Sequence, residues 1–158
     1  MQDQLFYTKG SMREDFQKDL REGHISDCPC CGRHAQMYRR KFHSSMALQL
    51  IRLYRLGNVK EYVHASKLIL PNCTGIGDFS KAKYWGLIHP KDKADEGKAN
   101  GYWLLTWEGE KFVTGKISIP KEVRVFDDHV VEVSAETITI SDALGAKYDD
   151  QALMRGEA

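Results

Sequence analysis

Apolar side chains recur at helical spacing in the middle of the chain. Residues 46 to 56 place their apolar members on one broad helical stripe and their two arginines off it. Ser44 or Ser45 can cap the start of this helix, because a serine hydroxyl accepts a hydrogen bond from a backbone N–H of the first turn. Gly57 and Asn58 interrupt the pattern. The sequence therefore predicts a core helix over residues 46–56.

Two shorter helices and two strands are predicted downstream. An apolar segment, residues 66–70, precedes a cluster of turn-forming residues, and a second helical pattern starts near Asp78 and ends at Gly86 as a C-cap. Residues 87–89 then form a short strand, and residues 101–106, which are rich in aromatic and branched side chains, form a returning strand. The polar loop between these strands has the length of a wing.

The C-terminal part changes character. Alternating apolar and polar residues predict two strands, residues 122–126 and 130–133, with Asp127-Asp128-His129 as the turn between them. A short extended segment follows at residues 137–140, and residues 141–145 indicate one capped helical turn. This part of the chain is therefore predicted to be a hairpin followed by a short helix.

The N-terminal part is polar. Its spacing of apolar residues predicts an amphipathic helix over residues 12–21, with residues 8–12 as a flexible joint, and residues 35–42 fit either a strand or the first turns of a helix. Together these elements predict an α+β protein with an N-terminal segment 1–43, a central domain 44–116 and a C-terminal segment 117–158. No apolar run approaches membrane-spanning length and no signal-peptide pattern is present, so we expect a cytoplasmic protein.

Four closely placed residues carry the first chemical motif. Cys28 and Cys31, with Pro29 and Gly32, make Cys-Pro-x-Cys-Gly, which resembles the knuckle of a zinc ribbon. In such a knuckle two thiolates bind one tetrahedral ion, and the glycine permits a tight turn. A closed structural site needs four ligands, and the second Cys-x-x-Cys of a ribbon is absent from this sequence. We expect one structural zinc ion, with His34 and His24 as the completing ligands.

Other readings of these cysteines stay open. Cys30, His43 and Cys73 are further candidates to complete a zinc site. A knuckle that has lost its metal and survives as a turn is the main alternative, because the ligand set is incomplete. A redox pair and a secreted disulfide framework are disfavoured, since no thioredoxin-like strand and helix surround the motif and the chain is expected in the cytosol.

The central domain resembles winged helix-turn-helix proteins such as the bacterial multidrug-response repressors. In that family the recognition helix runs into a Gly-Leu-Ile strand, here residues 86–88, and a Leu-Thr-x-x-Gly turn follows the wing, here residues 105–109. The resemblance covers residues 45–115 and implies that residues 62–64 pair as a third strand. It implies binding to double-stranded DNA and, as in many repressors of this family, a homodimer.

Charge is concentrated where the resemblance lies. The whole chain has a net charge of +1, but residues 33–93 hold twelve Lys or Arg and three acidic residues, a net charge of +9. Such an uneven distribution can attract a phosphate backbone even when the whole protein is nearly neutral. Acidic residues interleaved with the lysines of the wing oppose this attraction. The charge pattern therefore favours DNA contact.

The expected contacts follow from the resemblance and from the basic residues. Residues 78–85 would enter the major groove, the wing would approach the backbone, and the basic cluster before the central domain would add affinity for any sequence. The predicted DNA-binding residues are Ser80, Lys81, Lys83, Lys67, Lys91, Lys93, Arg39, Arg40 and Lys41.

The chain also resembles small phage-type proteins that join such a knuckle to a winged helix and an Ile-Pro-Lys hairpin, here Ile119-Pro120-Lys121. We therefore expect a phage or mobile-element transcriptional regulator. The alternative is a phage-type protein-interaction module that binds and redirects or inhibits a host protein, with Tyr84, Trp85, Tyr102, Trp103 or Trp107 as anchors. Phosphate-loop, zinc-protease and nucleophile-elbow motifs are absent, so we expect no enzymatic activity.

Overall fold

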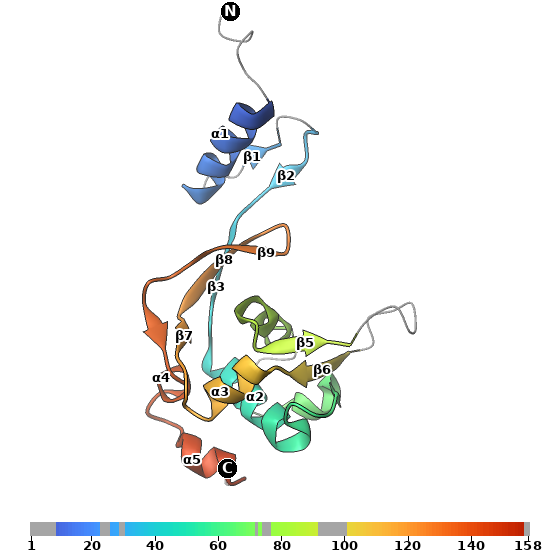
Figure 1. Ribbon diagram of the computed structural model, residues 1–158, viewed down its shortest axis with the longest axis vertical. Helices are drawn as coiled ribbons and strands as arrows, with labels where there is room; N and C mark the ends of the chain where they lie inside the picture. Colours follow the sequence, from blue (N-terminus) through green and yellow to red (C-terminus); the bar gives the residue numbers. More distant parts are fainter. Residues whose placement is uncertain are drawn as a thin grey trace, which may run out of the picture. The chain divides into compact units, whose positions relative to one another are not determined.

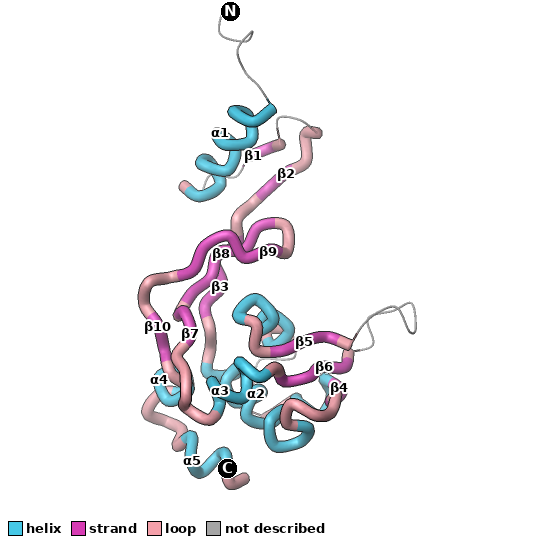
Figure 2. The backbone as a smooth tube through the Cα atoms, viewed as in Figure 1, coloured by secondary structure: helices cyan, strands magenta, loops and turns pink. Residues whose placement is uncertain are grey.

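The structure is a computed structural model that describes residues 9–22, 26–28, 31–71, 73, 77–91 and 101–156. The chain divides into two compact units, one of Met1–Arg39 with Arg124–Glu132 and the other of Arg40–Val123 with Val133–Ala158. Helices and small sheets alternate along it, as Figures 1 and 2 show, which confirms the predicted α+β class.

The second unit is built around helix α2 and a three-stranded sheet. The strand order is β4-β6-β5, and both pairs are antiparallel. Two short 3₁₀ helices, η2 and η3, stand where the sequence predicts helices over residues 66–70 and 78–85. In chain order the elements are α2 (Ser44–Gly57), β4 (Val63–His64), η2 (Ala65–Leu68), η3 (Phe79–Trp85), β5 (Ile88–Pro90), β6 (Tyr102–Leu105) and α3 (Trp107–Val113).

The C-terminal residues of this unit pack on the same core. Strand β7 (Ile119–Pro120) pairs antiparallel with β10 (Thr137–Ile138), and helices α4 (Ile140–Leu144) and α5 (Asp150–Met154) follow. Thr139 and Asp142 form a capping box at the start of α4, and Gly145 ends it. The predicted helical turn and the extended segment at residues 137–138 are confirmed, whereas β7, its pairing with β10, and α5 have no counterpart in the sequence-based prediction.

A separate three-stranded sheet has the order β3-β8-β9, from β3 (Tyr38–Lys41), β8 (Glu122–Phe126) and β9 (His129–Val133). Asp127 and Asp128 have φ angles of 49° and 62°. Two successive residues with positive φ are typical of the type I′ turn that joins two-residue hairpins. This confirms the predicted hairpin with Asp127-Asp128 as its turn, although His129, which the sequence-based prediction places in the turn, is the first residue of β9. Residues 38–41, for which the sequence fits either a strand or a helix, form a strand.

The first unit contains helix α1 (Lys9–Arg21) and a short hairpin of β1 (Ser26–Asp27) and β2 (His34–Ala35). The prediction of a flexible joint over residues 8–12 is wrong from Lys9 onward, because these residues form the first turn of α1. The ring of Phe16 meets that of Phe126 edge-on at 6.3 Å. The Arg124 guanidinium donates a hydrogen bond to the carbonyl of Arg21 over 2.8 Å.

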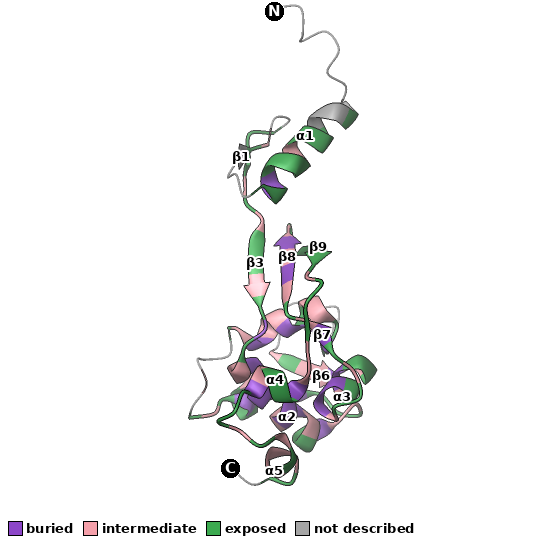
Figure 3. Cartoon of the chain, turned by 90° about the vertical axis from the view of Figure 1, so that its left-hand side faces the viewer, coloured by how far each residue is buried: buried purple, intermediate pink, exposed green. Residues whose placement is uncertain are grey.

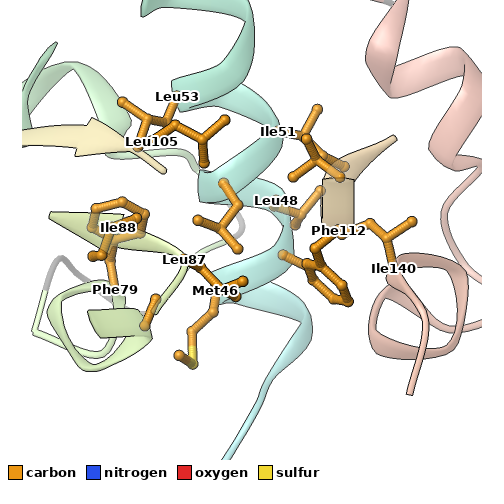
Figure 4. Packing of buried hydrophobic residues seen from close by; sticks show 14 of the residues in the cluster. Met46, Leu48, Ile51, Leu53, Phe79, Leu87, Ile88, Leu105, Phe112 and Ile140 are labelled. Atoms are coloured by element: carbon orange, nitrogen blue, oxygen red, sulfur yellow. The ribbon is translucent and has the colours of Figure 1, made fainter. Parts of the chain in front are cut away.

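Helix α2 is the centre of the second unit's core. Residues 46 to 51 are all buried, so contacts surround this part of α2 instead of covering one stripe, whereas Arg55 and Leu56 near its end are exposed. Figure 3 colours the chain by burial. Figure 4 shows Phe79 and Ile88 on one side of this helix and Phe112 and Ile140 on the other. A helix that is buried all round is the usual centre of a packed core. The elements that approach α2 from both sides are therefore held in place through it.

The ends of α2 differ in how closely they follow the prediction. Asn58, with a φ of 52°, ends the helix and donates its N–H to the Tyr54 carbonyl over 2.9 Å, as expected. The N-cap is His43, whose side chain makes no capping hydrogen bond, while Ser44 and Ser45 lie inside the helix. The predicted serine cap is therefore wrong. Burial of the helix against the core supplies the stability that a cap would have added.

Candidate nucleic-acid interface

A network of hydrogen bonds joins the end of η3 to the start of α3. Gly86 ends η3 with a φ of 71°, in the left-handed region that glycine adopts readily. The hydroxyl of Thr106 donates to the Gly86 carbonyl over 2.6 Å and accepts the N–H of Gly109 at 3.0 Å. The Thr106 N–H donates to the Leu87 carbonyl over 3.0 Å. Residues 86–88 and 105–109, which carried the resemblance to winged helices, are thus in contact with each other.

The last residue of η3 is anchored separately. The indole N–H of Trp85 donates to the Pro120 carbonyl over 2.7 Å, and its ring meets Phe42 edge-on at 5.4 Å. Phe79 and Ala82 are completely buried in the same core. Because both ends and the inner side of η3 are held, the helix presents its remaining side chains on a fixed scaffold.

The predicted contact residues of η3 differ in exposure and in their neighbours. The ammonium of Lys81 lies 2.7 Å from the Asp78 carboxylate, so a large part of its charge is balanced within the helix. The Lys83 side chain is exposed, and its ammonium lies 5.1 Å from the centre of the Tyr84 ring. The Ser80 hydroxyl donates to the Gly77 carbonyl over 2.9 Å. The two η3 lysines therefore have different neighbours, a carboxylate beside Lys81 and an aromatic ring beside Lys83.

The end of β5 and the neighbouring ends of β6 and β4 carry an aromatic and basic row that the sequence alone does not reveal. Lys91 donates its N–H to the Tyr102 carbonyl over 3.1 Å, and its ammonium lies 5.5 Å from the centre of the Tyr102 ring. The His64 ring also meets the Tyr102 ring, edge-on, with ring centroids 5.0 Å apart. His64 and Tyr102 are paired across β4 and β6, on the opposite sheet face from the paired Val63 and Trp103. Lys91, Tyr102 and His64 thus line one outward face.

Two features explain why this row could not be predicted from the sequence. Its three residues are separated along the chain, and the pairing of the strands brings them together. Gly101, with a φ of 70°, has no side chain, and a Cβ there would lie 3.2 Å from Nε2 of His64. The one available signal is the aromatic residue of the returning strand. Lys93, predicted to act with Lys91, lies outside the described residues.

The other predicted basic residues lie on η2 and β3. Lys67 is exposed on η2, and its carbonyl accepts a hydrogen bond from the Arg52 side chain over 3.3 Å. On β3, Arg39 is exposed, Arg40 is half-buried, and the ammonium of Lys41 lies 3.7 Å from the Glu122 carboxylate. Arg39 belongs to the first compact unit, whereas Arg40 and Lys41 belong to the second.

The cysteine motif lies at the tip of the β1–β2 hairpin in the first unit. Cys28 and Cys31 are thiols, not disulfides, and Gly32 has a φ of 68°. Nδ1 of His34 hydrogen-bonds to the Asp27 carboxylate over 3.1 Å. In the part of the chain that the structure describes, no three His, Cys, Asp or Glu residues are grouped closely enough to hold a metal, so His34 is not grouped with the two thiols. His24 and Cys30 lie outside the described residues.

Cys73 stands apart from this motif, beside the core of the second unit. Burial raises the pKa of its thiol, and the thiol contacts the Ser45 carbonyl over 3.7 Å. A higher pKa lowers the fraction of thiolate, which is the form that binds metal. The raised pKa therefore disfavours Cys73 as a metal ligand.

Comparison of the chain with protein-family models, with curated proteins and with solved structures finds no match. No helix among the described residues combines the length and the apolar character needed to cross a membrane.

Proposed function

We propose that the second unit binds double-stranded DNA as a winged helix. The observation that carries this proposal is the order of its elements together with the sheet order. A helix, a strand, two short helices and two antiparallel strands follow one another, and the strand that returns from the wing, β6, lies between β4 and β5. This is the arrangement in which the second short helix of a helix-turn-helix is presented to a major groove.

The charge of the exposed side chains indicates which residues would contact the backbone. Lys83 on η3 and Lys91 at the wing base lie beside aromatic rings, whereas Lys81 is paired with Asp78. A cation that is already paired gains less from a phosphate, because the existing ion pair must first be broken or shared. Lys81, which is paired and partly buried, is therefore expected to contribute less to DNA affinity than the exposed Lys83.

Fluorescence anisotropy with a random-sequence duplex over a series of salt concentrations tests this proposal. Lys83→Ala is expected to weaken binding and to reduce the slope of log affinity against log salt by about 0.9, the value of one lost phosphate contact. Lys81→Ala should have a smaller effect, and Asp78→Asn should strengthen binding, because it removes a negative charge and releases Lys81.

Lys147→Ala is the matched control. The Lys147 ammonium lies 5.5 Å from the centre of the Tyr148 ring, in the segment that precedes α5. Like Lys83→Ala, this variant removes one positive charge that lies beside a tyrosine ring. It should leave affinity and slope nearly unchanged. Wild-type protein that does not bind the duplex at low salt would refute DNA binding, and equal effects of Lys83→Ala and Lys147→Ala would refute the assignment of η3.

The proposed role is that of a phage or mobile-element transcriptional regulator acting as a cytoplasmic homodimer. Support for a dimer comes from β9, an edge strand of its described sheet whose five residues are all exposed and include Val131 and Val133. Exposed apolar edge strands readily pair with a second chain. Sedimentation equilibrium on wild type and on a Val131→Lys variant tests this point: a wild-type monomer, or a dimer that the lysine leaves intact, contradicts it.

One observation favours the alternative, an interaction module for a host protein. Trp107, the first residue of α3, is 70% exposed. Trp85 and Trp103 instead pack against Phe42 and Phe79, so they are unsuited as anchors. Exposed tryptophan is frequent at binding hot spots. A stoichiometric host protein that is captured by wild type and Lys83→Ala, but not by Trp107→Ala, would support this alternative.

A further inference from the structure

The β1–β2 hairpin places one cysteine immediately before a tight turn and a second cysteine within it. Residues 26 and 27 pair with residues 35 and 34, so Cys28 is the last residue before the turn and Cys31 is within it. The turn is closed by two backbone hydrogen bonds, from Cys28 N–H to the Arg33 carbonyl over 2.7 Å and from Gly32 N–H to the Cys28 carbonyl over 2.8 Å. The second bond bends the chain back over the first cysteine.

The glycine after the second cysteine is required by this turn. Gly32 has a φ of 68°, and no atom lies within 4 Å of the position that a Cβ would take. Space is therefore available, and it is the left-handed backbone conformation that favours glycine at this position. Two thiols separated by two residues, followed by a left-handed glycine, make the turn in which both sulfur atoms can reach one tetrahedral ion.

Solvent access and chemical state also suit a metal ligand. Cys31 is exposed and Cys28 is half-buried, and both are thiols. Cys73, by contrast, is held beside the core with a raised pKa. Thiols that are open to solvent can lose their protons when a metal ion binds, whereas burial opposes formation of the charged thiolate.

We propose that Cys28 and Cys31 together bind one Zn²⁺ ion as two of its four ligands, and that the ion stabilises the turn of the β1–β2 hairpin. Binding releases the two thiol protons to solvent and involves no change in oxidation state. The role of the metal is structural. This inference does not rest on the proposed DNA-binding function, since it concerns the other compact unit.

Metal titration of the full chain under reducing conditions tests the proposal. Metal-free protein is titrated with Co²⁺, and the thiolate-to-cobalt charge-transfer absorption is followed; Zn²⁺ is then added and should abolish it. Cys28→Ser and Cys31→Ser should each weaken binding by roughly a hundredfold or more, since even loss of a residue that only supports a ligand costs about 10- to 100-fold. Circular dichroism of each variant checks that the fold is retained.

Cys73→Ser is the matched control and should bind metal like the wild type. Metal content and molar mass, measured together, assign the two remaining ligands: one zinc ion per monomeric chain places them in the same chain, and one per dimer places them in a second copy. Both results support the thiolate pair. Failure of the wild type to bind metal, undiminished binding by the Cys28→Ser, Cys31→Ser double variant, or equal loss in Cys73→Ser would overturn the proposal.

Discussion

Replacing Gly109 with alanine tests how closely α3 packs on the strands beneath it. Gly109 is buried at the third position of α3, and a Cβ there would overlap the carbonyl oxygen of Leu87. The same Cβ would lie 2.6 Å from Cδ1 and 3.1 Å from Cγ of Leu105. The Leu87 carbonyl also accepts the Thr106 N–H at 3.0 Å. It therefore cannot move away without straining the link between β5, β6 and α3.

The size of the effect follows from two opposing contributions. Overpacking of a dense core costs about 1–3 kcal/mol, and the upper end applies here because one of the clashing atoms belongs to the backbone. Alanine is favoured over glycine inside a helix by about 1 kcal/mol, which offsets part of this cost. The free energy of unfolding should therefore fall by about 2 kcal/mol. For a chain of this size that corresponds to a Tm lower by roughly 4–8 °C.

Thermal and urea unfolding followed by circular dichroism measure this change. Gly77→Ala is the matched control, because Gly77 is exposed and no atom lies within 4 Å of its Cβ position. That variant should unfold like the wild type or be more stable by up to about 1 kcal/mol, since alanine restricts the unfolded chain. Equal stability of Gly109→Ala and wild type would show that α3 does not pack as closely on Leu87 as the structure indicates.

Two further predictions concern helix starts. Thr106→Ala removes the hydrogen bond to the Gly86 carbonyl and the cap on the Gly109 N–H, so it should lower the free energy of unfolding by about 1–2 kcal/mol. Thr106→Ser keeps a hydroxyl and should retain most of the wild-type stability. Identical urea midpoints for the two variants would contradict this prediction. The backbone N–H and then the side chain of Thr139 lower the pKa of Asp142. The contribution of Asp142 to stability is therefore complete above the ordinary carboxyl pKa and is lost as the pH falls through the lower pKa of the folded protein. Asp142→Asn should therefore make Tm depend less steeply on pH in the acidic range. An unchanged dependence of Tm on acidic pH would exclude this role of Asp142 as a capping residue.

The candidate site contains contacts that could not be predicted from the sequence. The sequence places lysines on the second short helix, but it cannot tell that Asp78 pairs with Lys81 while Lys83 extends toward Tyr84. A lysine on a helix surface commonly has either an acidic or an aromatic neighbour. Which of the two it contacts depends on which nearby side chains are packed into the core and which remain on the surface. For the same reason the tryptophans could not be sorted beforehand, although Trp107 is exposed and Trp85 is anchored to the core.

The sequence by itself determined the features that depend on neighbouring residues. Gly86 and Asn58 end helices because their backbone angles stop helix propagation, and Asp127-Asp128 forms the hairpin turn that its residue types favour. The α+β class and the position of the core helix α2 followed from local periodicity in the same way.

Only the tertiary structure decided the features that join distant residues. Strand β7 pairs with β10 across residues 119 and 138, His64 meets Tyr102 through the β4–β6 register, and Arg39 and Arg40 belong to different compact units. Local periodicity carries no information about which strands pair, because each short strand has suitable partners elsewhere in the chain. Burial around α2 selects among them, and that selection depends on the packing of the whole core.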